Sequence, residues 1–198
     1  MMTKFYDILF TLLTPLIYLV GLIDLPHRKI TGAHYFKYRD SINVGDIILT
    51  KSNWAPINLV NPGPFKHAAV YVGNIYGDEI KYVFESTRHG VILTNLVDFL
   101  LSKDAIAICE LKIKGEINKE TLQNTVLKLK GLPYDYLFDT TGKAVYCYEL
   151  GAITLTNLFP SLKLLPREIV KGKKIFDAQT FLDEQLFNIK IDSRKDVF

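Results

Sequence analysis

The chain has 198 residues, the length of one domain or of one domain with an appendage. Hydrophobic residues make up 48% and charged residues 23%, as in folded globular proteins, so disordered and fibrous classes are excluded. Lysine and arginine number 24 against 21 acidic residues, and a formal charge of +3 is too small to predict nucleic-acid binding. The 2 cysteines are too few for a disulfide framework.

An apolar segment lies near the N-terminus, where residues 8–23 form a run of 16 without a charge. This run is shorter than the roughly 20 residues of a membrane-spanning helix and longer than the ~10–14 of a typical core helix. Three interpretations stay open: a membrane anchor or uncleaved signal flanked by the basic residues 27–29, a helix packed on the domain, and a helix that docks a partner. We therefore divide the chain into an N-terminal hydrophobic segment, 1–33, and a domain over 34–198. The anchor interpretation predicts a membrane or cell-envelope location, and the others predict the cytoplasm.

Short apolar runs separated by turn residues follow this segment. They predict strands at 45–50, 67–73, 81–86 and 105–113. In the second run, alternation places His67, Ala69 and Tyr71 on one face of the strand and residues 68, 70 and 72 on the other. Strands joined by short turns favour an antiparallel sheet.

Helical patterns occupy the later part of the chain. They predict a helix capped by Asn118 over 118–130, one that begins near Cys147 and runs through 150–159, and one over 178–187. Strands in one block and helices in another indicate an α+β fold.

Several kinds of site are excluded by their missing motifs. The sequence has no phosphate-binding glycine loop and no serine nucleophile elbow. Its 4 histidines and 2 cysteines show no metal-ligand spacing, so no metal and no organic cofactor are expected. The remaining candidates for chemistry are a cysteine and a histidine.

Cys147 is the better nucleophile candidate of the two cysteines. Cys109 lies inside an apolar strand, where a thiol is normally a buried small hydrophobe. Cys147 opens a predicted helix, and the positive end of the helix dipole lowers the pKa of a thiol placed there. Unpaired backbone N–H groups at the same helix end can hold a developing oxyanion. This is the placement that a cysteine nucleophile needs.

A nucleophilic cysteine also needs a histidine base held by a third polar group. His67 begins a strand after a loop rich in turn formers, and Glu85 lies near the end of the next strand. Antiparallel pairing brings the start of one strand beside the end of the next, so Glu85 can orient the His67 ring. By residue type alone, a satisfied strand histidine and a solvated carboxylate fit the same positions.

The order of several short motifs resembles a known family. These motifs are GDIILTKS, HAAVYVGN, YVFES and GLPYDYLFD, followed by YCYEL and a closing IFDAQTFLDEQLF, and together they cover roughly residues 42–190. The pattern is similar to the circularly permuted papain-like amidases of the NlpC superfamily, the YiiX/YebB-like group. Two positions depart from it: Tyr148 stands where serine is usual, and Ala69 where glycine is common.

The resemblance implies a permuted papain-like catalytic domain, with an antiparallel sheet packed against the nucleophile helix. It implies Cys147 as nucleophile, His67 as base and Glu85 as the third member of the triad, the residues that placement along the chain also favours. We therefore expect a thiol hydrolase that cleaves an amide bond, with cell-wall peptides as candidate substrates.

Two other functions stay open. The same triad suits an acyltransferase or a lipid or N-acyl hydrolase, which a membrane-seeking N-terminus favours, and the fold also suits a catalytically inert membrane-attached or assembly protein. We expect a peptide or acyl-amide substrate. Predicted substrate contacts are Tyr134, Asp135, Tyr146 and Trp54.

Overall fold

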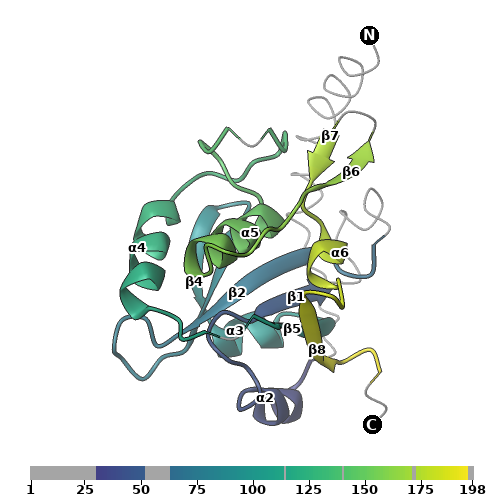
Figure 1. Cartoon of the computed structure of the whole chain (residues 1–198). Coiled ribbons are helices and arrows are strands. Elements are labelled where there is room, and N and C mark those ends of the chain that lie inside the picture. The colour runs from purple at the N-terminus through teal and green to yellow at the C-terminus, as the bar shows by residue number, and fades with distance from the viewer. Residues whose placement is uncertain (1–29, 52–62, 114, 140, 171–172, 196–198) are drawn as a thin grey trace.

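The computed structural model describes residues 30–51, 63–113, 115–139, 141–170 and 173–195 (Figure 1). At its centre is a six-stranded antiparallel sheet in the order β4-β3-β2-β1-β5-β8. Its strands are β1 (Ile47–Lys51), β2 (His67–Gly73), β3 (Tyr82–Thr87), β4 (Gly90–Asn95), β5 (Ala105–Leu111) and β8 (Phe187–Asp192). The four predicted strands are therefore present, and the structure adds β4 and β8 at the two edges of the sheet.

Helices cover both faces of the sheet. One face carries α4 (Lys119–Leu129), α5 (Cys147–Leu158) and α6 (Ala178–Phe181), and the other carries α2 (Gly32–Tyr38) and α3 (Leu96–Leu101). In Figure 1, α5 crosses in front of β2, the strand against which it packs. A small ribbon of β6 (Arg167–Val170) and β7 (Lys173–Ile175) stands apart from the main sheet. The α+β prediction with an antiparallel sheet is confirmed.

Alternation along each strand divides the core into two layers. Ile47 and Leu49 of β1 pack toward α5, whereas Ile48 packs toward α2 and α3. The same division holds in β2, where Ala69 and Tyr71 lie in the layer of α2 and α3 and residues 68, 70 and 72 lie in the layer of α5. The predicted faces of β2 are therefore confirmed.

The helix predicted over 178–187 is wrong in its second half. Asp177 caps α6 by accepting the backbone N–H of Thr180, but the helix ends at Phe181. A turn at Asp183 follows, and residues 187–192 then pair with β5 as β8. In this strand Phe187 and Ile189 pack in the layer of α5, and a register shift against β5 places Ile191 in the layer of α2 and α3.

The N-terminal segment 8–23 and its basic flank 27–29 lie outside the described residues, so the predicted N-terminal helix stays a prediction. The described chain is packed from Ile30 onward, because Ile30 and Tyr38 are both buried between the sheet and α3. Among the helices that the structure describes, none combines the length and apolar character needed to cross a membrane.

Candidate active site

Cys147 is the first residue of α5 and lies at the end of the helix where backbone N–H groups have no intrahelical partner. Its side chain is buried, at 3% exposure. The helix lies close to the sheet at Gly151, where an added Cβ would come within 3.0 Å of Phe181 Cζ and 3.3 Å of Ile47 Cδ1. Because the residue one turn after Cys147 has no side chain, the first turns of α5 can pack closely on the sheet.

Tyr148 fastens the same helix end to the segment that leads into β2. Its hydroxyl donates a hydrogen bond of 3.0 Å to the carbonyl of Phe65, two residues before His67, and its ring stacks on Phe181. Serine, usual at this position in the resembled family, is too short for this reach. The departure from the family pattern therefore supplies a direct link between the cysteine helix and the histidine strand.

His67 and Glu85 meet on one face of the sheet. In the register of β2 and β3, Ala69 is opposite Glu85, so His67 lies diagonally across from the carboxylate. His67 Nε2 is 2.7 Å from Glu85 Oε2, and the hydroxyl of Thr94 on β4 donates to the other carboxylate oxygen. Glu85 is 5% exposed. Both of its oxygens are therefore used within the sheet, and its orientation is fixed.

The thiol of Cys147 contacts this pair. Cys147 is hydrogen-bonded to the side chain of His67, to the backbone N–H of Ala68 and to the hydroxyl of Tyr134. Since Glu85 takes Nε2 of the imidazole, Nδ1 is the ring nitrogen left for the thiol. The imidazole ring also lies near the ring of Phe99 on α3, with 6.3 Å between the two ring centroids. The structure thus brings Cys147, His67 and Glu85 into one hydrogen-bonded chain.

The three groups shift one another's pKa values. Burial alone raises the pKa of Cys147, but the hydrogen bond and charge of His67 outweigh burial and hold that pKa below its ordinary value. Burial lowers the pKa of His67, but its bonds to Cys147 and Glu85 raise it to about 9. Burial raises the pKa of Glu85, but His67 holds it at about 2. Each shift thus favours the charged form of its group: thiolate, imidazolium and carboxylate.

Of the four predicted substrate contacts, Tyr134 is placed at the thiol and Trp54 lies outside the described residues. Tyr146 is fully buried, and its hydroxyl accepts the Phe176 N–H at 2.7 Å. Asp135 is 3% exposed. Both side chains are therefore buried, and their role as substrate contacts stays a prediction.

Asp135 instead organises the loop before α5. Its carboxylate accepts three backbone N–H groups, those of Leu137 at 2.9 Å, Phe138 at 2.8 Å and Asp139 at 2.7 Å. These bonds hold Phe138 in the left-handed region, at a φ of 54°, and its ring meets Tyr146 edge-on. The loop is thereby fixed immediately after Tyr134, the residue whose hydroxyl contacts the thiol.

Glu149 is a site residue that was not predicted. It accepts the backbone N–H of Tyr146, as the third residue of a helix does in a capping box. Its other oxygen, Oε2, is buried and has no hydrogen-bond partner, and burial followed by the charge of Asp135 raises its pKa to about 7. In the sequence, a glutamate three residues after the cap position is the signal for this contact. Tyrosine is not a usual cap residue, so Tyr146 hides the capping-box pattern.

Cys109 is unsuited to nucleophilic chemistry. It is fully buried in β5, and burial, with Asp46 next, raises its pKa to about 12. Among the residues that the structure describes, no three or more His, Cys, Asp and Glu side chains converge as a metal ion would require.

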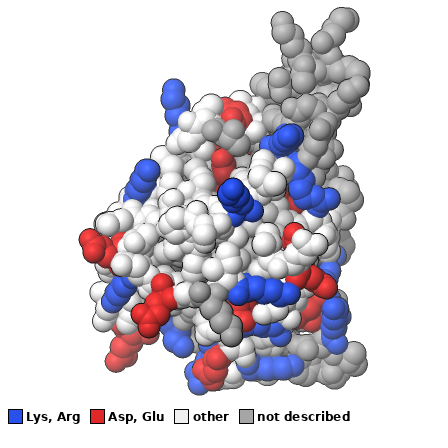
Figure 2. Space-filling model, viewed as in Figure 1, with Lys and Arg blue, Asp and Glu red and all other residues white. Residues whose placement is uncertain are grey.

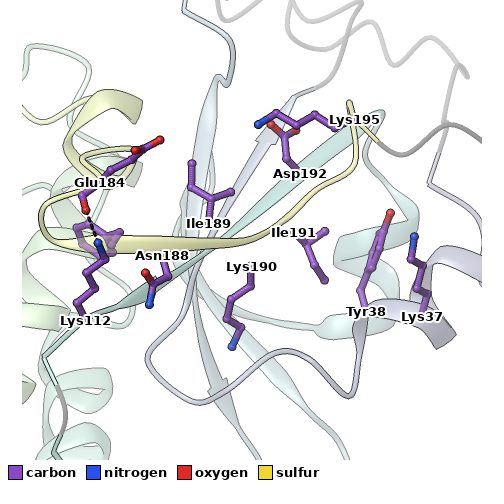
Figure 3. Close-up of a pocket in the computed structure, with 11 residues that line it drawn as sticks. Lys37, Tyr38, Lys112, Glu184, Asn188, Ile189, Lys190, Ile191, Asp192 and Lys195 are labelled. Atoms are coloured by element: carbon purple, nitrogen blue, oxygen red, sulfur yellow. Dashed lines mark hydrogen bonds between the residues drawn. The ribbon is translucent and has the colours of Figure 1, made fainter.

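A separate open pocket of about 580 Å³ lies along the edge strand β8 (Figure 3). Its lining includes Lys112, whose ammonium group donates to the Glu184 carbonyl, and Lys190, which is paired with Asp46 at 2.7 Å. It contains none of the predicted site residues.

Figure 2 shows basic and acidic side chains interspersed over the face in view, without a broad region of one sign. The chemistry is therefore concentrated at the start of α5.

Comparisons with known proteins show the family and the fold of the chain. The sequence model of one family, described as permuted papain-like amidase enzyme, YaeF/YiiX, C92 family, matches residues 41–185. The crystal structure of metalloprotein YiiX from Escherichia coli O157:H7 matches with a TM-score of 0.61 at 16% identity, covering 76% of this chain and 97% of that chain. At this identity the likeness shows a shared fold. No curated protein matches the chain. The family match shows that the chain belongs to the permuted papain-like amidases, and it is therefore an enzyme of the hydrolase class.

Proposed function

We propose that this permuted papain-like amidase cleaves its amide bond with Cys147 as nucleophile, His67 as general acid and base, and Glu85 as the group that orients the imidazole. The observation that carries the proposal is the continuous chain of hydrogen bonds from the thiol through the imidazole to a buried carboxylate. A nucleophile, a base and an orienting group in this order are what covalent catalysis by cysteine requires.

Acylation begins with attack of the Cys147 thiolate on the substrate carbonyl carbon. The imidazolium of His67 gives its proton to the leaving nitrogen as the carbon–nitrogen bond breaks, so the amine departs neutral and a thioester remains on Cys147. His67, now neutral, takes a proton from water, and the hydroxide attacks the thioester. The acid is released, and the thiolate and imidazolium are restored.

The start of α5 supplies donors for the oxyanion that forms in both steps. The backbone N–H of Cys147 is free of intrahelical bonding because the residue opens the helix. The second donor is the hydroxyl of Tyr134, which already lies within hydrogen-bond distance of the thiol. Burial, with the charge of Cys147 next, raises the pKa of Tyr134, so its hydroxyl stays protonated as a donor.

Peptide amides are the substrate class that we propose, with bacterial cell-wall peptides as the first to test. The acyl-transfer alternative uses the same thioester, which is then captured by an amine or hydroxyl group in place of water. Mass spectrometry of the products separates the two, because hydrolysis in H₂¹⁸O places one ¹⁸O atom in the released acid and transfer places none.

The decisive experiment compares Cys147→Ala with Cys109→Ala. We expect the first variant to lose both hydrolysis and labelling by iodoacetamide, and the second to keep both, since the Cys109 thiol is buried and protonated. Hydrolysis by the folded Cys147→Ala protein would overturn the proposed mechanism.

A further inference from the structure

Two lysines flank the start of the strand that carries His67. Lys66 directly precedes His67, and Lys51 is the last residue of the neighbouring strand β1. The backbone N–H of Lys66 donates 2.8 Å to the carbonyl of Thr50, which is also the register partner of His67. Both lysines are thus one residue away from the pair formed by Thr50 and His67.

Lys51 lies on the face of the sheet that α5 covers, because it continues the alternation of Ile47 and Leu49. Leu49 is opposite Ala68, whose N–H contacts the Cys147 thiol. Two residues of strand separate Lys51 from that point, a distance of about 7 Å along β1. The four-carbon stem of a lysine is long enough to bring its ammonium group beside a substrate bound at the thiol.

Neither ammonium group has a counter-ion among the residues that the structure describes, and both side chains are half-buried. Burial lowers the pKa of Lys66, and the charge of Lys51 lowers it further. The carboxylate of the site, Glu85, is already bonded to His67 and Thr94. Two like charges held together without a partner destabilise the folded chain, and a bound anion would relieve that repulsion.

We propose that Lys51 and Lys66 form a carboxylate-binding subsite, so that the enzyme prefers amides that carry a carboxylate close to the scissile carbonyl. The inference rests on the proposed function and names its substrate class. An ammonium group binds an oxyanion as a point charge and does not demand the planar, two-pronged contact of arginine. Peptide-like amides carry a carboxylate on an acidic side chain or at a free C-terminus. A carboxylate is therefore the anion that we expect this subsite to bind.

The test uses two alkylating reagents that differ by one charge. Iodoacetate and iodoacetamide both react with the Cys147 thiolate, forming a sulfur–carbon bond and releasing iodide, but only iodoacetate carries a carboxylate. Rates at Cys147 are followed by mass spectrometry of its peptide in the full chain. In Lys51→Gln/Lys66→Gln, we expect the iodoacetate rate, divided by the iodoacetamide rate, to fall roughly three- to tenfold from its wild-type value. Dividing the two rates removes any change in the reactivity of the thiolate itself, because both reagents report that change equally.

Matched variants separate local recognition from net charge. Lys119→Gln/Lys128→Gln makes the same charge change on exposed positions of α4 and should leave the ratio at its wild-type value. Lys51→Arg/Lys66→Arg keeps both charges and should keep the ratio. The two single glutamine variants, each expected to give part of the fall, provide the same readout if the double variant does not fold.

The proposal is overturned if the ratio of the folded glutamine variants stays within about twofold of wild type. It is also overturned if the α4 control lowers the ratio equally, because salt screens distant charges and a local subsite should have the larger effect. Failure of the proposed function has a different signature. It would appear as hydrolysis by Cys147→Ala, whatever the alkylation ratio.

Discussion

Replacing Glu85 with glutamine tests the charge pattern of the site while preserving its shape. The glutamine carbonyl can still accept the Thr94 hydroxyl, so β3 and β4 keep their contact. The His67 imidazole, however, faces an uncharged amide, and its protonated form loses the carboxylate 2.7 Å away. The substitution therefore removes the group that favours imidazolium without opening a cavity.

The size of the effect follows from the pKa of Glu85. Burial raises that pKa, but His67 holds it at about 2 against an ordinary value of 4.5. Each tenfold change in protonation is worth about 1.4 kcal/mol, so the pair stabilises its charged form by about 3 kcal/mol. We expect kcat/KM of Glu85→Gln to fall roughly tenfold at pH 8, because the loss of about 3 kcal/mol lowers the pKa of His67 from about 9 by roughly two pH units and removes most of the imidazolium at that pH.

Alkylation of Cys147 by iodoacetamide between pH 5 and 10 measures the loss directly. In the wild type the thiolate should react at pH 6, since His67 stays protonated up to about 9. In Glu85→Gln the rate should fall below that of wild type between about pH 7 and 8, where the less stabilised imidazolium has lost its proton, and recover above the ordinary thiol pKa of about 8.5. Glu116→Gln, at an exposed position, is the matched control. Superposable rate profiles for Glu85→Gln and wild type would refute the assigned charge pattern.

The same pair predicts how stability depends on pH. The Glu85 pKa is depressed, so its contribution is complete above pH 4.5 and is lost as the pH falls through about 2. The His67 pKa is raised, so its contribution is complete below pH 6.5 and is lost as the pH rises through about 9. The free energy of unfolding of wild type minus that of Glu85→Gln should therefore be largest between pH 4.5 and 6.5, as urea denaturation would show.

Three further substitutions test other parts of the site. Tyr134→Phe removes one oxyanion donor, so kcat should fall roughly 10²-fold without a change in melting temperature, and an unchanged kcat would contradict that role. Burial and nearby carboxylates raise the pKa of Glu149 to about 7, so its ionisation costs stability as the pH rises from 4.5 through 7. In urea denaturation, Glu149→Gln should gain about 1–3 kcal/mol over wild type at pH 8 and little at pH 4, and an equal gain at both would argue against titration. Gly151→Ala places a Cβ 3.0 Å from Phe181 Cζ and should destabilise by about 1–3 kcal/mol in calorimetry, whereas Gly32→Ala, with open space around it, is the control and should stabilise.

Local patterns in the sequence were sufficient to predict the strands and the helix that carry the proposed catalytic residues. Alternation assigned the faces of β2, and the position of Cys147 before an apolar run predicted a helix start. Asn118 likewise caps α4 through its side chain, which accepts the Thr121 N–H at 2.9 Å. In each case the signal and its structural consequence lie within a few residues, so packing elsewhere in the chain does not change the result.

Other features depend on contacts that the sequence does not display. The end of α6 is decided by pairing of residues 187–192 with β5, which competes with a helical pattern over the same apolar residues. For Asp135, the sequence alone leaves a substrate contact and packing at a turn both open. Only the folding of residues 135–139 around it shows that three backbone N–H groups occupy its oxygens.

The register between β2 and β3 links the hydrophobic core to the proposed chemistry. Val83 packs toward α3 and Phe84 toward α5, and these two buried residues fix which face of the sheet receives Glu85. A slip of one residue would turn Glu85 toward α5 and place Phe84 beside His67, because side chains alternate strictly along a strand. The 2.7 Å contact of His67 and Glu85 is therefore a consequence of core packing as much as of their own charges. Val83→Asp, which changes none of the three proposed catalytic residues, should for this reason lower kcat/KM through the register of the sheet, and an unchanged rate would contradict that link.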